Sequence, residues 1–201
     1  EGGQVVVLGK PNVGKSTLFN RLLGSPRAIV TKVAGTTRDL LAETLDLNGI
    51  PITLVDTAGI RATGDAIESE GVRRAKAALK VARMVIVVLD RSRPLEKEDT
   101  ELMADTATLA RLLVINKTDL PDADVDRVKR QLSEHDLLIE EWGGEVIAIP
   151  LSAKTGDGID NLLETLLVVA EISELKADPG RSAVGVIVEA KVDKSRGPVA
   201  T

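Results

Sequence analysis

A glycine-rich segment near the start of the sequence carries residue types that bind phosphate. It reads Gly9-Lys10-Pro11-Asn12-Val13-Gly14-Lys15-Ser16 and fits the pattern G-x-x-x-x-G-K-[ST] directly after an apolar run. The glycines let successive N–H groups point inward, and a helix that begins at the end of the loop adds its positive dipole end. We expect Lys15 to bridge the β- and γ-phosphates of a nucleotide and Ser16 to bind Mg²⁺. The alternative, a glycine turn with a surface lysine, is disfavoured by the strand-to-helix context. The predicted nucleotide contacts of this segment are Asn12, Val13, Gly14, Lys15, Ser16 and Thr17.

A second polar segment, Asp56-Thr57-Ala58-Gly59, follows the apolar run 52–55. A carboxylate at the end of a strand can hold Mg²⁺, usually through water, so Asp56 is a predicted metal ligand. Gly59 would let the backbone approach a γ-phosphate closely. The four residues alone could equally form an acidic turn, and it is their position one hairpin after the phosphate loop that favours the metal site.

Two segments further along the chain predict a site for a guanine base. Asn116-Lys117-Thr118-Asp119 follows the apolar run 111–115, and Ser152-Ala153-Lys154 follows the run 146–149. The Asp119 carboxylate can accept two N–H hydrogen bonds from guanine, whereas adenine offers no such pair and would leave a buried carboxylate unsatisfied. GTP is therefore favoured over ATP. The predicted base contacts are Asn116, Lys117, Asp119, Ser152, Ala153 and Lys154.

Short apolar runs that alternate with helical patterns must position these segments. Runs without polar alternation are typical of strands buried on both faces, as in a parallel sheet covered by helices. Asn48-Gly49 between 40–47 and 50–55 favours a tight hairpin, which adds one antiparallel edge strand. We predict an α/β fold, a P-loop NTPase G domain whose six-stranded, mostly parallel sheet is flanked by five helices. The helices are expected at 15–23, 68–80, 98–108, 124–134 and 159–171.

The composition of the chain changes after about residue 172. Asp178-Pro179-Gly180 is typical of a linker, and residues 184–192 have strand character. We therefore predict a nucleotide-binding domain over 1–172, with residues 173–201 as a linker and the truncated start of a β-barrel-like unit.

Composition and charge exclude several kinds of function. The 201 residues carry a net charge of −5 and contain no cysteine and one histidine, so thiol chemistry and cysteine-zinc sites are excluded. The acidic balance and the 1% aromatic content disfavour general nucleic-acid binding, so any contact with RNA or the ribosome must be local. No apolar run approaches the ~20 residues that span a bilayer. With no targeting segment at the N-terminus, the cytoplasm is the expected compartment.

These motifs together resemble the translation-factor-related class of P-loop GTPases. Residues 5–120 are similar to the G domains of the MnmE (TrmE), Der and Era GTPases. The likeness rests on the phosphate loop, Ala28-Ile29-Val30-Thr31, Ala34-Gly35-Thr36-Thr37-Arg38-Asp39 and Asp56-Thr57-Ala58-Gly59-Ile60-Arg61. It implies that Gly35-Thr36-Thr37-Arg38-Asp39 is the first of two switch segments, that Thr37 binds Mg²⁺, and that Asn12, Thr31, Val33 and Thr36 bind a K⁺ ion. The second switch contains Arg61, and a homodimer through the two switches is a further expectation. Ile60 stands where many GTPases have a residue that orients water, and the likeness gives that role to Glu68, which could equally be an exposed helix residue.

Residues 116–201 resemble bacterial translation initiation factor 2 instead. The similar segments include Glu140-Glu141-Trp142-Gly143-Gly144 and Arg196-Gly197-Pro198-Val199-Ala200-Thr201. A chimeric, reconstructed or designed chain, joined near 100–116, would explain the two resemblances, and an untypical natural GTPase is the alternative. We expect His135 to end a helix and Trp142 to anchor packing.

The sequence thus predicts a protein that hydrolyses GTP with Mg²⁺ at a low intrinsic rate, stimulated by K⁺. The predicted catalytic residues are Lys15, Thr37, Gly59 and Glu68. Three alternatives stay open: a GTP-dependent binding switch, a translation-factor fragment that associates with the ribosome or RNA, and a scaffold that binds nucleotide poorly.

Overall fold

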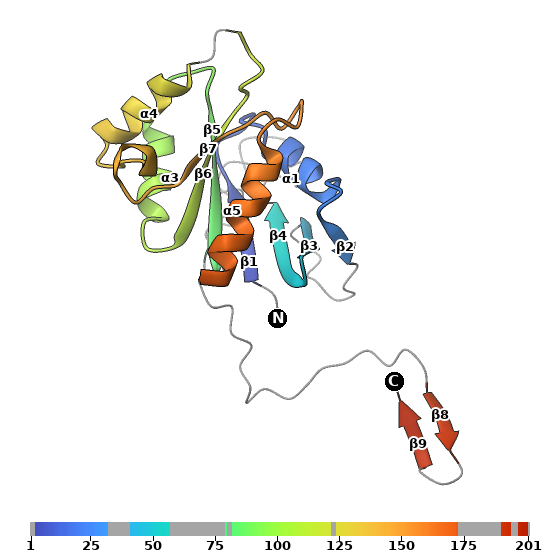
Figure 1. Cartoon of the computed structure of the whole chain (residues 1–201). Helices are drawn as coiled ribbons and strands as arrows, with labels where there is room; N and C mark the ends of the chain where they lie inside the picture. The colour runs from blue at the N-terminus through green and yellow to red at the C-terminus, as the bar shows by residue number, and fades with distance from the viewer. Residues whose placement is uncertain are drawn as a thin grey trace, which may run out of the picture.

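The computed structural model describes residues 3–31, 41–56, 79, 82–121, 124–172, 190–193 and 197–200. Strands and helices follow one another along these ranges (Figure 1). The strands are β1 Gly3–Leu8, β2 Ile29–Thr31, β3 Leu41–Leu47, β4 Ile50–Asp56, β5 Met84–Asp90, β6 Ala110–Asn116, β7 Ala148–Pro150, β8 Ala190–Asp193 and β9 Gly197–Ala200. The helices are α1 Lys15–Leu23, α3 Lys97–Asp105, α4 Val125–Glu134, the short 3-10 helix η1 Glu140–Trp142, and α5 Ile159–Ile172.

The main sheet has seven strands in the order β2-β3-β4-β1-β5-β6-β7. The predicted α/β class and the mostly parallel sheet are confirmed. β3 is antiparallel to its neighbours β2 and β4, and the other neighbouring strands of this sheet pair in parallel. The predicted count of six strands lacked β2, whose three residues are too few to give a periodic pattern. The antiparallel strand is consequently one place in from the edge.

The hairpin between β3 and β4 follows the prediction. Asn48 and Gly49 have φ values of 53° and 87°, and positive φ at both central residues is what a type I′ turn requires. The backbone N–H of Gly49 donates to Asp46 Oδ1 over 2.7 Å. This turn sets the register in which Leu41 stands opposite Asp56.

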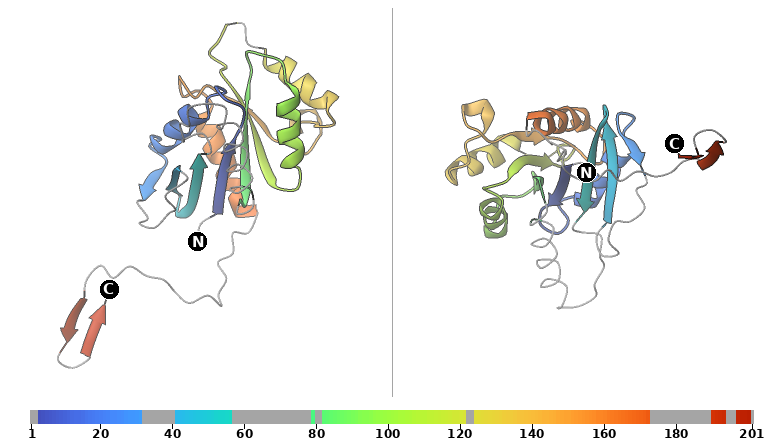
Figure 2. Two further views of the ribbon diagram at one scale, coloured as in Figure 1. Left: turned by 180° about the vertical axis from the view of Figure 1, so that it is seen from behind. Right: turned by 90° about the horizontal axis from the view of Figure 1, so that it is seen from below.

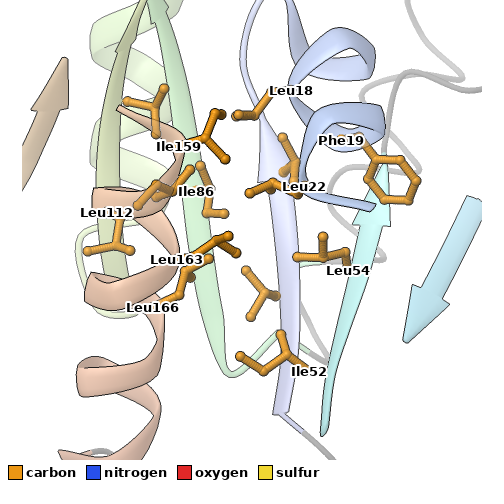
Figure 3. Packing of buried hydrophobic residues seen from close by; sticks show 14 of the residues in the cluster. Leu18, Phe19, Leu22, Ile52, Leu54, Ile86, Leu112, Ile159, Leu163 and Leu166 are labelled. Atoms are coloured by element: carbon orange, nitrogen blue, oxygen red, sulfur yellow. The ribbon is translucent and has the colours of Figure 1, made fainter. Parts of the chain in front are cut away.

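Helices cover both faces of the sheet. Buried residues of α1 and α5 share one hydrophobic cluster with alternate residues of β1, β5 and β6, and residues of α3 and α4 share a second cluster with the other face of β5 and β6. Figure 2 shows α5 and α3 on opposite sides of the sheet. In Figure 3, Leu18 and Leu22 of α1 and Leu163 of α5 point into the first cluster. Burial on both faces explains the uninterrupted apolar runs.

Four of the five predicted helices are confirmed. The largest shift is three residues, because the helix predicted at 98–108 ends at Asp105. The helix predicted at 68–80 lies outside the described residues apart from Leu79. His135 follows α4, as predicted, and its backbone N–H donates to Leu132 O over 3.1 Å. Trp142 is not the predicted packing anchor, because 43% of it is exposed.

The C-terminal part of the chain contributes a second, two-stranded sheet. In it, β8 and β9 pair antiparallel. Most of the strand predicted at 184–192 lies outside the described residues, and the domain boundary at 172 stays a prediction. No helix among the described residues is long and apolar enough to cross a membrane.

Candidate nucleotide site

The segment between β1 and α1 forms a tight curl that only glycine permits at two positions. Gly9 has φ +149°, and a Cβ there would lie 2.5 Å from Val88 O. Gly14 has φ +100°, and a Cβ there would lie 2.3 Å from Asn116 Nδ2. Real Cβ atoms do not approach other atoms this closely, so both glycines are required by their neighbours as well as by their backbone angles.

The side chain of Lys15 is folded into this curl and is 8% exposed. Its Nζ donates to Gly9 O and to Lys10 O, each over 2.7 Å. Two of the three ammonium donors are thus used to fix the amine in the loop. Burial lowers the pKa of Lys15, and the nearby Asp56 carboxylate offsets part of that shift. An anion bound in the loop would likewise offset the cost of burying the Lys15 ammonium.

The residues predicted to hold Mg²⁺ come from two neighbouring elements. Asp56 ends β4, is 2% exposed and stands in register with Val7 of β1. Ser16 lies exposed in the first turn of α1. A carboxylate and a hydroxyl are the hard oxygen ligands that Mg²⁺ prefers, and their position beside the loop fits the ion. The third predicted ligand, Thr37, lies outside the described residues.

A buried asparagine joins the phosphate loop to both base segments. Asn116 ends β6 and is 3% exposed. Its Nδ2 donates to Val13 O over 2.8 Å, and its Oδ1 accepts the Ala153 N–H over 3.0 Å. The three segments, distant in sequence, are therefore held together by one side chain.

The carboxylate of Asp119 is held by the loop that follows β7. Its Oδ1 accepts the hydroxyl hydrogen of Ser152 over 2.8 Å, while Lys154 Nζ lies 3.8 Å from Oδ2. Ser152 is fully buried, and its Oγ also accepts the Thr155 N–H over 3.1 Å. Both carboxylate oxygens therefore have a defined environment.

Asp90 at the end of β5 is a site residue that the sequence analysis missed. Its Oδ2 accepts from Lys117 Nζ over 2.6 Å, and its Oδ1 accepts from the backbone and hydroxyl of Ser92 over 2.9 and 2.6 Å. Burial acts to raise the pKa of Asp90, but the hydrogen bonds from Lys117 and Ser92 outweigh it and the pKa lies below its ordinary value. The sequence does carry a signal for Asp90: like Asp56, it is an acidic residue directly after an apolar run.

These loops enclose a pocket of about 170 Å³ at the carboxyl ends of β1 and β6. Its walls are Gly14, Thr17, Asn116, Lys117, Asp119, Leu120, Ala153 and Lys154. Seven of these eight residues are predicted nucleotide contacts. The eighth, Leu120, offers an apolar surface against which a base can lie.

Lys10 connects the phosphate loop to α3, a contact that the sequence analysis also missed. Its Nζ pairs with Glu96 and lies 3.5 Å from Asp99 Oδ2. The same Asp99 carboxylate accepts the Glu96 N–H over 3.0 Å at the start of α3. The backbone carbonyl of Lys10 accepts a hydrogen bond from Lys15 Nζ. The residue that fixes Lys15 is thus itself held by acidic side chains at the start of α3.

The structure places the predicted K⁺ ligands and the remaining predicted residues only in part. The predicted K⁺ ligand Asn12 has a left-handed backbone with φ 63°, and Thr31 lies in β2, where its backbone alone is described. The remaining predicted residues Val33, Thr36, Thr37, Gly59 and Glu68 lie outside the described residues.

Comparisons with known proteins agree with this arrangement. Residues 4–117 match the family described as 50S ribosome-binding GTPase. The chain is 39% identical over 199 residues to translation initiation factor IF-2 of Clostridium botulinum and 40% identical over 197 residues to that of Desulforamulus reducens. Both alignments cover 98% of this chain but only 28% and 19% of those proteins. The likeness to initiation factor IF-2 therefore extends beyond residues 116–201 into the first half.

Solved structures show the same fold. Era of Aquifex aeolicus, in a complex with GDP and AlF4⁻, matches with 30% identity and a TM-score of 0.60, over 83% of this chain and 56% of that one. Elongation factor SelB of Methanococcus maripaludis, with a GTP analogue, matches at 22% identity and a TM-score of 0.58, over 94% of this chain and 36% of that one. The second match shows the fold alone.

Proposed function

The chain belongs to the family of 50S ribosome-binding GTPases, and we propose that its own pocket binds GTP with Mg²⁺ and hydrolyses it to GDP and phosphate. The observation that carries the proposal is the pair of hydrogen bonds of the Asn116 side chain, which donates to Val13 O and accepts the Ala153 N–H. They join a loop suited to phosphates and a loop suited to a base within one pocket.

Hydrolysis needs little covalent work from the protein. Water attacks the γ-phosphorus, the bond from that phosphorus to the bridging oxygen breaks, and GDP leaves with the electron pair. Positioning and charge neutralisation dominate such reactions. Lys15 supplies a positive charge fixed in the loop, and the N–H groups of the first turn of α1 would donate to the phosphate oxygens. Bound Mg²⁺, held by Ser16, Thr37 and, through water, Asp56, would neutralise charge on the β- and γ-phosphates.

Base selection rests on Asp119. Its carboxylate would accept the two N–H groups on one edge of guanine, and Ser152 fixes the carboxylate from behind. Adenine would leave the carboxylate with fewer partners in a partly buried site, which costs affinity. GTP and GDP are therefore the proposed ligands.

The rate of the isolated protein is expected to be low. Ile60 has no polar atom with which to orient water, so that role would fall to Glu68 and to the backbone of Gly59. A K⁺ ion near Asn12, with oxygens from Thr31 and from Val33 and Thr36, would add positive charge beside the bridging phosphate oxygens. Single-turnover hydrolysis in KCl and in NaCl tests this, and equal rates would contradict the K⁺ site. A homodimer through the switches predicts that the KCl rate rises with protein concentration.

A second candidate function, a role in translation, is favoured by the relatives. The initiation factors align with 98% of this chain, and an Era structure at 29% identity contains nucleotides 1506–1542 of 16S ribosomal RNA. In that role the protein would work in the cytoplasm as a GTP-dependent switch on the ribosome. Co-sedimentation with ribosomes in GTP but not in GDP would support the role, and equal sedimentation in both would count against it.

The decisive experiment is a titration of the protein with GDP, GTP and ATP. We expect both guanine nucleotides to bind and ATP to bind far more weakly. Lys15→Ala should remove tight binding, because the loop then lacks its fixed cation. Lys97→Ala is the matched control, since Lys97 is exposed on α3 and pairs only with Glu101 among the described residues. Wild-type affinity in Lys15→Ala would refute the loop assignment.

A further inference from the structure

Arg21 of α1 reaches across to the loop that carries the predicted base contacts. Its Nε donates to Ala153 O over 3.2 Å, and its Nη2 donates to Lys154 O. Arg21 lies 132 residues from Ala153 and 133 residues from Lys154 in sequence. A Cβ on Gly156 would lie 3.6 Å from Arg21 Nη1, so the guanidinium also lies against the backbone of that turn.

The peptide bond that Arg21 contacts begins a chain of hydrogen bonds. Lys154 O and the Thr155 N–H belong to one peptide group, and that N–H donates to Ser152 Oγ over 3.1 Å. The Ser152 hydroxyl then donates to Asp119 Oδ1 over 2.8 Å. In such a chain each donor polarises the next. Arg21 is thus connected to the Asp119 carboxylate through a series of hydrogen bonds in which each donor and acceptor is defined.

We propose that Arg21 is a positioning residue for guanine selectivity. It holds the 152–156 turn so that Ser152 presents its hydroxyl hydrogen to Asp119, which leaves the second carboxylate oxygen facing the base. Because Arg21 lies on the helix that begins at the phosphate loop, the same contact fixes the distance between the phosphate and base halves of the site. The inference rests on the proposed binding of guanine nucleotides.

The chain offers a matched control for this contact. Arg27 also connects the segment after α1 to the C-terminal part of the domain, since its Nη1 donates to Glu164 Oε1 of α5 over 2.7 Å. Its partner is exposed and does not line the pocket. Arg27→Met therefore removes an arginine bridge of similar span without touching the hydrogen bonds to Asp119.

The test compares GDP with inosine diphosphate, which lacks the 2-amino group and so offers Asp119 only one of two N–H donors. In Arg21→Met we expect GDP affinity to fall about tenfold, since part of a charge-assisted hydrogen bond is lost, and inosine diphosphate affinity to fall less. The GDP preference should therefore shrink. Arg21→Lys should behave similarly, because an ammonium cannot reproduce the planar fork. Arg27→Met should leave both affinities unchanged.

A double-mutant cycle keeps the result interpretable if Arg21→Met lowers stability. In a Ser152→Ala background the connection to Asp119 is already broken, so adding Arg21→Met should not reduce the GDP preference further. Equal losses for both nucleotides, an unchanged preference in Arg21→Met, or an additive cycle would each overturn the proposal. Wild-type protein that fails to bind GDP would instead refute the proposed function, which separates the two failures.

Discussion

Replacing Asp119 with asparagine tests the base site most directly. In the wild type, Ser152 donates to Oδ1, so in Asp119→Asn the amide oxygen is expected to keep that hydrogen bond. The amide NH2 then takes the place of Oδ2 and faces the base. It would meet the N–H groups of guanine donor to donor, whereas the wild-type carboxylate would accept from them.

The expected loss follows from the two hydrogen bonds involved. Hydrogen bonds to a charged group contribute about 1.5–3 kcal/mol each, so losing both costs at least about 3 kcal/mol, or roughly 150-fold in the dissociation constant of GDP. Xanthine carries a carbonyl where guanine carries the 2-amino group, and the new NH2 can donate to it. Xanthosine diphosphate should therefore bind the variant better than it binds the wild type.

Competition titrations with GDP and xanthosine diphosphate measure both effects. Lys97→Met serves as the control, because the Lys97 side chain is 88% exposed on α3, pairs with Glu101 there and does not line the pocket. GDP affinity within threefold of wild type in Asp119→Asn, with no gain for xanthosine diphosphate, would refute the assignment of the base site.

Two further changes test the neighbouring contacts. Gly14→Ala should weaken GDP binding at least about tenfold, because its Cβ would lie 2.3 Å from Asn116 Nδ2 and would disturb the hydrogen bond to Val13; titration of the variant checks this, and wild-type affinity would contradict it. Asp90→Asn should destabilise the protein at neutral pH but not at low pH. The folded pKa of Asp90 lies below its ordinary value, so its stabilisation is fully present above the unfolded pKa of about 3.9 and is lost as pH falls through the folded pKa. Urea unfolding of both proteins at pH 7, 4 and 3 measures the difference, and a difference that grows with acid would be contrary to the role of the Lys117 ion pair.

The sheet could be predicted well where its strands are buried on both faces. β5 and β6 read as unbroken apolar runs because helices cover each side, and the hairpin turn was encoded by Asn48-Gly49. β2 could not be found in this way, since three residues carry no period. The prediction for Trp142 failed because the residue buried at this point of the chain is Ile139, before η1, which is 1% exposed.

The candidate site could be predicted only as far as its motifs reach. Loop residues such as Lys15 and Asp119 belong to short motifs, and the residue types and spacing of a motif indicate its chemical role. Lys10 and Arg21 are held by partners 86 and 132–133 residues away, and the Lys117 partner of Asp90 lies 27 residues away. No local pattern encodes such contacts, although the position of Asp90 directly after an apolar strand is a signal for the residue itself. The sequence therefore predicts the groups proposed to contact a ligand, but not the groups that hold them in place.

The two contacts that hold the 152–156 turn differ in burial, and therefore in what their removal should cost. Asn116 and Arg21 each bridge the phosphate-loop side of the pocket to the 152–156 turn, one through a buried amide and the other from an exposed helix position. Removing a buried partner leaves polar groups unsatisfied, at a cost of about 1–3 kcal/mol each, whereas water can replace an exposed one. Changes at Asn116 should therefore reduce both stability and binding, while changes at Arg21 should reduce binding with little loss of stability. The 152–156 turn is thus held by the Asn116 contact, which we expect the fold to require, and by the Arg21 contacts, which we expect to matter for ligand binding alone.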